Sequence, residues 1–229
     1  GPYRLRNLLP LIARHNNTLV LPEVIPTEEQ TMAFSTRTTL RTEGVHLVVD
    51  PAKAYFNPRL GGQRRQFTER LHEFSTELAR PLRIADPYCG VGPMLRSILH
   101  HGVPITALLG VDLNPAAIEL ARLNIPLEPS AVIEIIEGHA KEIASIEGWC
   151  GTMDVVFCNL PRSGTAAFLD VQPLLCPGAL MLGWIHAPTD SAESLIRSLR
   201  GELECENVMC RETRSYSSTV SIYVVEVRV

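Results

Sequence analysis

A glycine turn between an apolar run and a helical pattern constrains this chain more than any other feature of its sequence. Residues 82–86 are mostly apolar and end in an acid, and Gly90 and Gly92 follow closely. Glycine lets the backbone turn sharply and approach a ligand closely. Apolar residues at helical spacing come next, and a second apolar run, 107–112, again ends in an acid. This order predicts a strand–turn–helix–strand unit of an α/β domain.

The rest of the chain repeats this alternation. Apolar periodicity over 67–79 predicts an amphipathic helix, and Asn114-Pro115 starts another, because proline fits the first helical turn. Further apolar runs predict strands at 132–136, 154–158 and 179–184. The long alternating tail, 219–227, predicts an antiparallel strand added late to the sheet. We therefore predict a doubly wound, Rossmann-like α/β fold with a mostly parallel sheet and a C-terminal antiparallel strand.

Residues 3–50 differ from the rest and predict a small N-terminal extension. Apolar residues 8–12 indicate a short helix, and the alternating stretch 45–49 indicates strands or a β-ribbon that ends at Asp50-Pro51. We expect residues 51–229 to form the main domain. The leading Gly1-Pro2 is typical of a cleaved purification tag, and we expect no signal peptide after it.

The charge and the cysteine content of the chain limit which kinds of binding partner and metal site we expect. The 229 residues include 21 basic and 25 acidic side chains, a net charge of −4, whereas a dedicated RNA-binding protein usually carries a basic face. No apolar run reaches the roughly 18 residues that a membrane span needs. The six cysteines show no CxxC pair and no metal-ligand spacing. We therefore expect reduced thiols, no metal, no membrane partner and a cytoplasmic location.

The acids at the strand ends predict a nucleotide-like ligand. Asp86 precedes the glycine turn, and Asp112 stands twenty residues after Gly92, where an acid binds ribose hydroxyls in doubly wound folds. A dinucleotide site needs a third glycine, but Leu95 occupies that position, and no P-loop lysine follows. The order of acid, Gly-x-Gly and ribose acid instead favours S-adenosylmethionine (SAM) in a class I methyltransferase fold. The alternative is that these glycines only form a turn.

A polar tripeptide follows the fourth predicted strand. Asn159-Leu160-Pro161 stands at the carboxyl end of that strand, where an Asn or Asp followed by Pro commonly faces the transferring group of SAM. The carbonyl oxygen of Asn159 can accept a hydrogen bond from a substrate amine. The alternative is an asparagine that only caps the turn.

Together these motifs resemble the archaeal and eukaryotic tRNA (guanine-37-N1) methyltransferase family, whose relatives include aminocarboxypropyl transferases of the wyosine pathway. The resemblance covers residues 38–229, and its most specific part is the segment Tyr55-Phe56-Asn57-Pro58-Arg59-Leu60. The other matching segments occur more widely or are less distinctive: 41–44, 86–93, 111–115, 159–161 and the last strand after 215–217.

The resemblance implies that Tyr55 lies beside SAM, that Arg59 belongs to the site and that Asn159 orients an acceptor guanine. It also implies a bent SAM conformation. The candidate SAM-binding residues are Tyr55, Asp86, Tyr88, Gly90, Gly92, Asp112, Leu113, His139, Ala140 and Asn159. The candidate catalytic residues are Tyr55, Arg59, Gln63, Asn159 and Pro161.

Two positions depart from the family pattern. The family continues with Thr-Glu-Arg, in which the glutamate is the proposed general base, whereas this chain has Gly62-Gln63-Arg64. Glutamine forms hydrogen bonds but does not take up a proton near neutral pH. The family's aspartate that contacts the adenine amino group aligns with His139. These departures favour a different reaction on the same scaffold.

We therefore expect small-molecule chemistry at SAM, either transfer to a small acceptor or attack at Cγ of the amino acid arm. In the intramolecular version, the amine of SAM closes on Cγ and gives azetidine-2-carboxylate and methylthioadenosine. An α-amine has a reference pKa of about 7.7–8.0, so no strong base is needed. The ring of Tyr55 or Tyr88 can stabilise the sulfonium. The alternatives are methylation of guanosine 37 in tRNA and SAM binding without turnover.

Several other side chains are expected to be structural. Arg64 and Arg65 are predicted to be a solvent-exposed pair, and His186 is predicted to lie in a loop after a strand. Trp149 and Trp184 are predicted to pack in the core.

Overall fold

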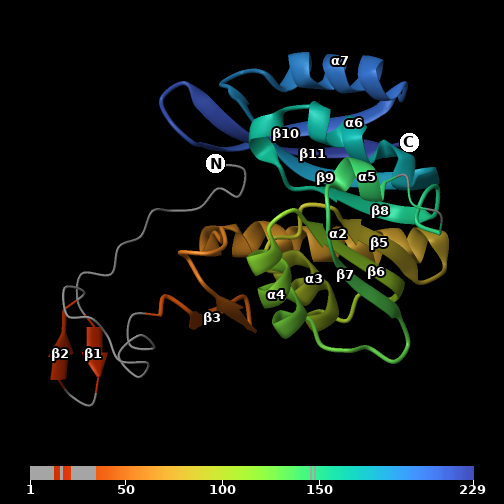
Figure 1. The fold of residues 1–229 in the computed structure, drawn as a ribbon. Helices are drawn as coiled ribbons and strands as arrows, with labels where there is room; N and C mark the ends of the chain where they lie inside the picture. Colours follow the sequence, from red (N-terminus) through yellow and green to blue (C-terminus); the bar gives the residue numbers. More distant parts are fainter. Residues whose placement is uncertain (1–12, 16–17, 22–34, 145, 147) are drawn as a thin grey trace.

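The centre of the molecule is a seven-stranded sheet with the strand order β10-β11-β9-β8-β5-β6-β7 (Figure 1). The structure is a computed structural model that describes residues 13–15, 18–21, 35–144, 146 and 148–229. Six of these strands point the same way, and β11 runs antiparallel between β9 and β10. The predicted doubly wound fold is confirmed. The strands are β5 (Leu82–Asp86), β6 (Ile105–Asp112), β7 (Val132–Glu137), β8 (Met153–Cys158), β9 (Leu175–Pro188), β10 (Asn207–Ser215) and β11 (Val220–Arg228).

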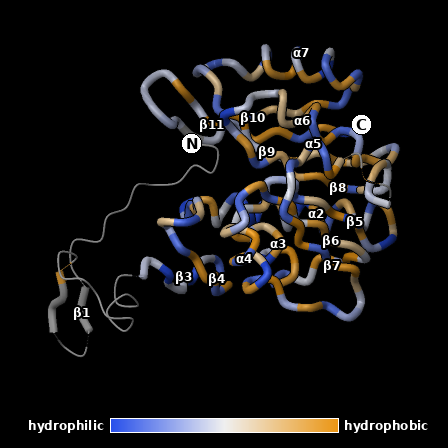
Figure 2. Tube along the Cα trace, in the orientation of Figure 1, coloured by the Kyte–Doolittle hydropathy of each residue, from blue (hydrophilic) through white to orange (hydrophobic). Residues whose placement is uncertain are grey.

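Helices cover both faces of the sheet (Figure 1). One face holds α2 (Gly61–Leu78), α3 (Pro93–His100) and α4 (Pro115–Asn124), and the other holds α5 (Ala140–Ile143), α6 (Ala166–Val171) and α7 (Ala192–Leu203). The central strands are apolar on both sides, as buried parallel strands are. In β8, for example, Val155 and Phe157 join the α2–α3 core, whereas Val156 and Cys158 join the opposite core. Figure 2 shows these hydrophobic residues running through the sheet.

The connections create a reversal point beside β5. From β5 the chain continues through β6 to β7 on one side, and it then returns to β8 on the other side of β5. Open α/β sheets bind ligands outside the carboxyl ends of the strands at such a point. Asp86 ends β5 and Asn159 follows β8, so these two predicted site residues lie on either side of the reversal.

The helix α2 begins at Gly61, six residues before the periodic pattern predicted. Its buried apolar side chains start only with Phe67, so the first turn carries no apolar signal. A short 3₁₀ turn, η1 (Pro58–Leu60), leads directly into the helix. The earlier start places Gln63 and Arg64 in the first turn of α2.

An N-terminal β-hairpin packs beside α4. Its strands β3 (Thr38–Thr42) and β4 (Val45–Val49) pair antiparallel. Glu43 and Gly44 between them have φ values of 47° and 81°, as tight hairpin turns require. Another antiparallel pair consists of β1 (Ala13–His15) and β2 (Thr18–Val20). The helix predicted near residues 8–12 lies outside the described residues, and the domain boundary at residue 50 stays a prediction.

Asn124, the last residue of α4, attaches this hairpin to the glycine turn. Its Oδ1 atom accepts a hydrogen bond from Val48 N at 2.7 Å. Its Nδ2 atom donates to the carbonyl oxygens of Val48 and Val91, both at 2.9 Å. Because the side chain is buried, α4, β4 and the turn after β5 are held together without competition from water.

Two C-terminal elements were not predicted from the sequence. The helix α7 buries Leu199 and Leu203 against the sheet. The strand β10 lies at the edge of the sheet, and Val208 is its only buried residue among those whose side chains are described. An edge strand with one exposed face and few core contacts lacks the alternation that marked β11.

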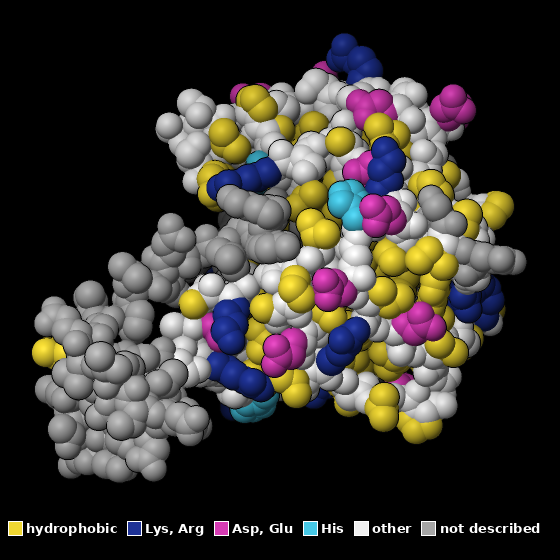
Figure 3. Space-filling model, in the orientation of Figure 1, with side chains coloured by type: hydrophobic (Ala, Val, Ile, Leu, Met, Phe, Trp, Pro, Cys, Tyr) yellow, Lys and Arg dark blue, Asp and Glu magenta, His cyan; other side chains and the backbone are white. Residues whose placement is uncertain are grey.

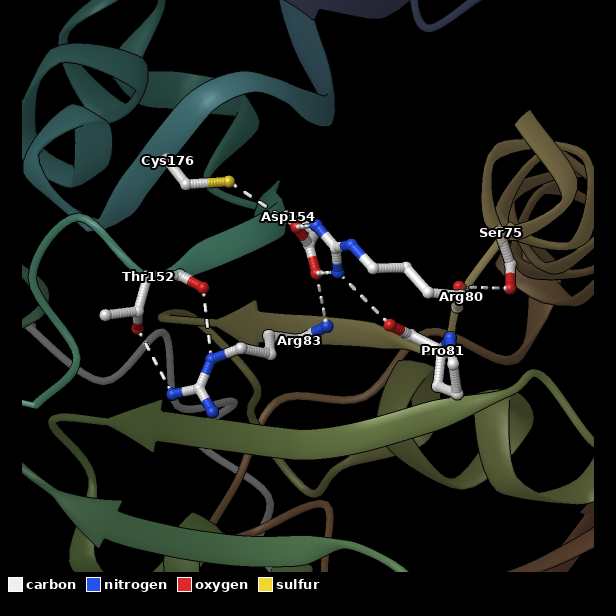
Figure 4. Close-up of polar contacts among 7 residues, drawn as sticks. All are labelled: Ser75, Arg80, Pro81, Arg83, Thr152, Asp154 and Cys176. Carbon is white, nitrogen blue, oxygen red and sulfur yellow. Dashed lines mark hydrogen bonds and ion pairs between the residues drawn. The ribbon is translucent and has the colours of Figure 1, made fainter. Parts of the chain in front are cut away.

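A buried acid at the amino ends of the central strands connects the end of α2 to the sheet (Figure 4). Asp154, near the start of β8, accepts hydrogen bonds from both Nη atoms of Arg80, at 2.6 and 2.8 Å, and from Arg83 N at 2.8 Å. Burial alone would raise the pKa of Asp154, but these bonds and one from the Cys176 thiol lower it. The cluster lies at the amino end of β8, away from Asn159, so it stabilises the fold and is separate from the predicted site.

Candidate cofactor and acceptor site

A pocket of about 650 Å³ opens at the carboxyl ends of the central strands. This volume lies within the roughly 300–1,000 Å³ that small-molecule sites occupy. Nine predicted SAM-binding residues line it: Tyr55, Asp86, Tyr88, Gly90, Asp112, Leu113, His139, Ala140 and Asn159. Of the predicted catalytic residues, Tyr55, Asn159 and Pro161 line the pocket, and Arg59 and Gln63 are not among the lining residues. The functional roles of all these residues stay predictions.

The glycine turn after β5 is held by the end of β6. Asp112 Oδ2 accepts from Gly90 N at 2.8 Å, and Asp112 Oδ1 accepts from Asn114 N at 2.9 Å. Gly90 and Gly92 have φ values of 56° and 78°, which L side chains rarely adopt. A Cβ atom at Gly92 would also lie 3.2 Å from Ile125 Cδ1. Gly92 therefore shapes the turn, and Asp112 presents an acceptor carboxylate beside it.

His139 and its neighbours form the rim beyond β7. Leu113 is 45% exposed at the rim, whereas Ala140 is buried in the wall. His139 caps α5, and its Nδ1 atom accepts from Lys141 N at 3.2 Å. In the neutral ring the proton then sits on Nε2, which makes His139 a donor. This chain therefore offers a hydrogen-bond donor at the position that aligns with an aspartate, an acceptor, in the resembling family.

Asp86 and Asn159 meet at the reversal point. Asp86 is 1% exposed, its Oδ1 atom accepts from Tyr88 N at 3.3 Å, and its Oδ2 atom accepts from Asn159 Nδ2 at 3.2 Å. Burial is the main cause that raises the pKa of Asp86 to about 7, against those two hydrogen bonds, and the nearby charge of Asp112 raises it further. The ionised form of Asp86 only accepts hydrogen bonds, and the amide nitrogen of Asn159 faces it.

The other amide atom of Asn159 has no such partner. Its Oδ1 atom is buried and has no hydrogen-bond partner among the described residues, while the side chain lines the pocket. A buried carbonyl oxygen without a donor costs roughly 1–3 kcal/mol. A ligand N–H placed against Asn159 Oδ1 would remove that cost, so the observation fits an amine or amide group in the pocket.

Another wall of the pocket comes from α2, β9, β11 and the loop before β11. Arg64, Trp184, His186, Tyr216 and Ile222 line it, and the rings of His186 and Tyr216 stack with their centroids 4.6 Å apart. Two expectations were wrong here. Arg64 is 4% exposed, unlike its neighbour Arg65, and His186 belongs to β9 because that strand continues to Pro188.

The remaining predicted residues lie around the segment before α2. Tyr55 is 40% exposed and lines the pocket together with Phe56 and Asn57, which belong to the same sequence motif but were not among the candidate site residues. Tyr88 is half-buried, and burial raises its pKa. Arg59 is exposed on the η1 turn. The Oε1 atom of Gln63 is buried without a partner among the described residues.

Comparison with known proteins gives the family of this chain. The sequence profile of the TRM5/TYW2 methyltransferase domain matches residues 38–175. The tRNA (guanine(37)-N(1))-methyltransferase Trm5b of Methanocaldococcus jannaschii is 34% identical over 198 residues, which are 85% of this chain and 52% of that protein. The chain thus spans about half the length of this curated relative.

Solved structures show the same fold. The Methanocaldococcus jannaschii tRNA m1G37 methyltransferase superposes with a TM-score of 0.67 at 24% identity, covering 85% of this chain and 55% of that one. The TYW2 protein of the same organism, solved in complex with AdoMet, gives a TM-score of 0.67 at 14% identity, covering 85% and 86%. In the described part of the chain, no helix has the length and apolar character needed to span a membrane. The chain belongs to the TRM5/TYW2 methyltransferase domain family and is an enzyme of the SAM-dependent methyltransferase superfamily.

Proposed function

We propose that the protein binds SAM in this pocket and alkylates a nitrogen atom that Asn159 orients. The observation that carries the proposal is the buried Asn159 Oδ1 atom, which has no donor among the described residues although its side chain lines the pocket, while Asp86 accepts a hydrogen bond from the amide nitrogen. SAM supplies an electrophilic carbon next to its sulfonium. The residues of this chain have to hold SAM, position the nitrogen and accept its proton.

The strand ends provide the groups that would hold SAM. Asp112 offers carboxylate lone pairs beside the glycine turn, which suits ribose hydroxyls. Leu113 and Ala140 offer apolar contact for a planar base. Asp86 lines the same pocket with a pKa of about 7, so beside Asn159 it can accept a proton near neutral pH.

The leading candidate for the nitrogen is N1 of guanosine 37 in a tRNA. The family and the name of the M. jannaschii relative support this candidate. A guanine presents N–H groups to an acceptor such as Asn159 Oδ1. In this reaction the N1 lone pair bonds to the methyl carbon, the carbon–sulfur bond breaks, S-adenosylhomocysteine leaves, and the N1 proton passes to a base.

A second candidate is the α-amine of SAM itself, and Gln63 is the observation that favours it. Gln63 stands where the resembling family has its proposed base, and an amide takes up no proton at neutral pH. The α-amine needs little help, because its reference pKa is about 7.7–8.0. Its lone pair would bond to Cγ, the Cγ–sulfur bond would break, and methylthioadenosine would leave with azetidine-2-carboxylate as the product.

One incubation series distinguishes these candidates. The full chain is incubated with SAM alone and with SAM plus a tRNA transcript that carries guanosine or adenosine at position 37. We expect S-adenosylhomocysteine only with the guanosine transcript if tRNA is the acceptor, and methylthioadenosine without RNA if SAM cyclises. Asn159→Ala should abolish either product, because it removes the acceptor that is proposed to orient the nitrogen. A folded wild-type protein that forms neither product in any mixture would contradict the proposal.

A further inference from the structure

Arg64 is a buried cation with no carboxylate of the described residues within ion-pair distance. It lies in the first turn of α2, is 4% exposed and lines the pocket. Its Nη2 atom donates to the hydroxyl of Thr42 at 3.3 Å, and its Cζ atom lies 5.7 Å from the centre of the Phe56 ring. A guanidinium has five N–H donors, and no carboxylate of the described residues lies within 4.0 Å of this one. Most of its hydrogen-bonding capacity therefore remains available to the pocket.

Other arginines in and just after α2 have carboxylate partners. Arg70 lies 3.0 Å from a carboxylate oxygen of Glu226 and 2.9 Å from one of Glu77. Arg80 holds Asp154 with two hydrogen bonds. For Arg64, burial lowers the pKa to about 10, partly offset by the more distant Glu43, so the group stays charged at neutral pH. A buried charge of this kind is costly unless a counter-charge joins it.

Trp184 adds a second donor on the same wall. The side chain is 5% exposed and lines the same pocket, and its Nε1 atom has no hydrogen-bond partner among the described residues. Its ring packs on Phe67 with centroids 4.9 Å apart. Phe67 follows Arg64 by three residues in α2, so both side chains lie on one face of the helix. Arg64 and Trp184 thus both line the pocket, and Phe67 connects their positions on α2 and β9.

We propose that Arg64 and Trp184 form an oxyanion subsite that binds a carboxylate or phosphate group of a ligand in this pocket. The acids that line the pocket, Asp86 and Asp112, sit at the strand ends and already accept backbone or amide hydrogen bonds. The Arg64–Trp184 wall offers donors instead. The inference rests on the proposed function for its ligands, since the carboxylate of SAM's amino acid arm and a phosphate of a nucleotide acceptor are the two anions that the proposed reaction would bring.

The test compares ligands that differ only by the anionic group or the arm that carries it. Calorimetry on the full chain measures S-adenosylhomocysteine against methylthioadenosine, and guanosine 5′-monophosphate against guanosine. Arg64→Gln should weaken the binding of one anionic ligand about ten- to hundred-fold, the range of a charge-assisted hydrogen bond. The affinity for the matching ligand without the arm or the charge should stay within about two-fold of that of wild type. Trp184→Phe removes the indole N–H but keeps an aromatic ring on Phe67. It should weaken the binding of the same ligand about two- to ten-fold.

Arg65→Gln is the matched control. Arg65 is the exposed neighbour that pairs with Glu69 at 3.6 Å, so its removal should change no affinity. A loss for S-adenosylhomocysteine alone identifies the carboxylate as the anion, and a loss for guanosine monophosphate alone identifies the phosphate. The subsite is overturned if neither variant changes either affinity, or if wild type binds the anionic members no better than their counterparts. Absence of S-adenosylhomocysteine binding by wild type would instead contradict the proposed SAM function, while the nucleotide arm would still decide the subsite.

Discussion

Asp86 couples the charge state of the pocket to the stability of the fold. Its carboxylate is buried, and burial raises its pKa to about 7, whereas an aspartate in an unfolded chain titrates near 3.9. Between these values the folded protein binds a proton that the unfolded chain has released. The stabilising effect of that proton is complete below about pH 4 and is lost as the pH rises through 7.

Asp86→Asn should remove this dependence while keeping the hydrogen bond from Asn159. Because the asparagine does not ionise, the variant should gain stability relative to wild type as the pH rises from 5 to 8, by roughly 1 kcal/mol per pH unit within the window. Urea denaturation at several pH values measures the difference. A difference that stays constant across this range would show that Asp86 does not titrate there.

Gln63 decides between the two candidate acceptors through a single substitution. The amide of Gln63 does not take up a proton near neutral pH. Gln63→Glu replaces it with a carboxylate, which can act as a base. If guanosine 37 is the acceptor, we expect RNA methylation to rise ten-fold or more. If the amine of SAM is the nucleophile, a nearby negative charge favours the ammonium form, so methylthioadenosine formation should stay level or fall.

The measurement is the yield of both products, wild type beside Gln63→Glu, at several pH values. Gln66→Glu, an exposed position of the same helix, controls for the added charge. A gain in RNA methylation with no methylthioadenosine from either protein would eliminate the cyclisation candidate.

At the scale of elements, the central strands and their ends were predictable, and the pocket wall lined by Arg64, His186 and Tyr216 was not. Asp86, Gly90, Asp112 and Asn159 follow apolar runs, and parallel strands bring their carboxyl ends to one edge of the sheet. Arg64 was assigned to the surface because the first turn of α2 has no apolar periodicity. Arg64 contacts Thr42 of β3 and the ring of Phe56, and the helical pattern of α2 does not encode these contacts with earlier elements.

The same limit applies to His186 and Tyr216. They come from β9 and from the loop between β10 and β11, and only the antiparallel insertion of β11 brings them together. The Asn159 motif was visible, but the burial of its Oδ1 atom follows from the position of Asp86 on another strand.

Asn124 controls the attachment of one element to another. Asn124→Ala would leave Val48 N and the carbonyl oxygens of Val48 and Val91 without their partner. We expect unfolding to become easier by roughly 1–3 kcal/mol, with faster hydrogen exchange at the Val48 amide. Ser130→Ala, at an exposed position, serves as the control. A free energy of unfolding equal to that of wild type would mean that the β3–β4 hairpin docks through its apolar contacts alone.

At the scale of the whole molecule, the net charge limits the affinity that we expect for RNA. The net charge is −4, and on the face in Figure 3 the described basic and acidic side chains are interspersed. We expect this chain to bind a tRNA transcript with a micromolar or weaker dissociation constant at physiological salt, and more tightly at low salt. Fluorescence anisotropy at 50 and 200 mM salt measures this. Submicromolar, salt-insensitive binding would show that base contacts dominate.

The position of Trp184 should make ligand binding in the pocket measurable by tryptophan fluorescence. The chain has two tryptophans. Trp149 lies in the opposite core beside Arg83, whereas the indole of Trp184 borders the pocket. Titration with S-adenosylhomocysteine should shift the emission of wild type, and Trp184→Phe should lose that shift; an equal shift in both would assign it to Trp149. The packing of one indole between α2 and the pocket thus gives the protein a built-in, label-free optical signal for each binding event.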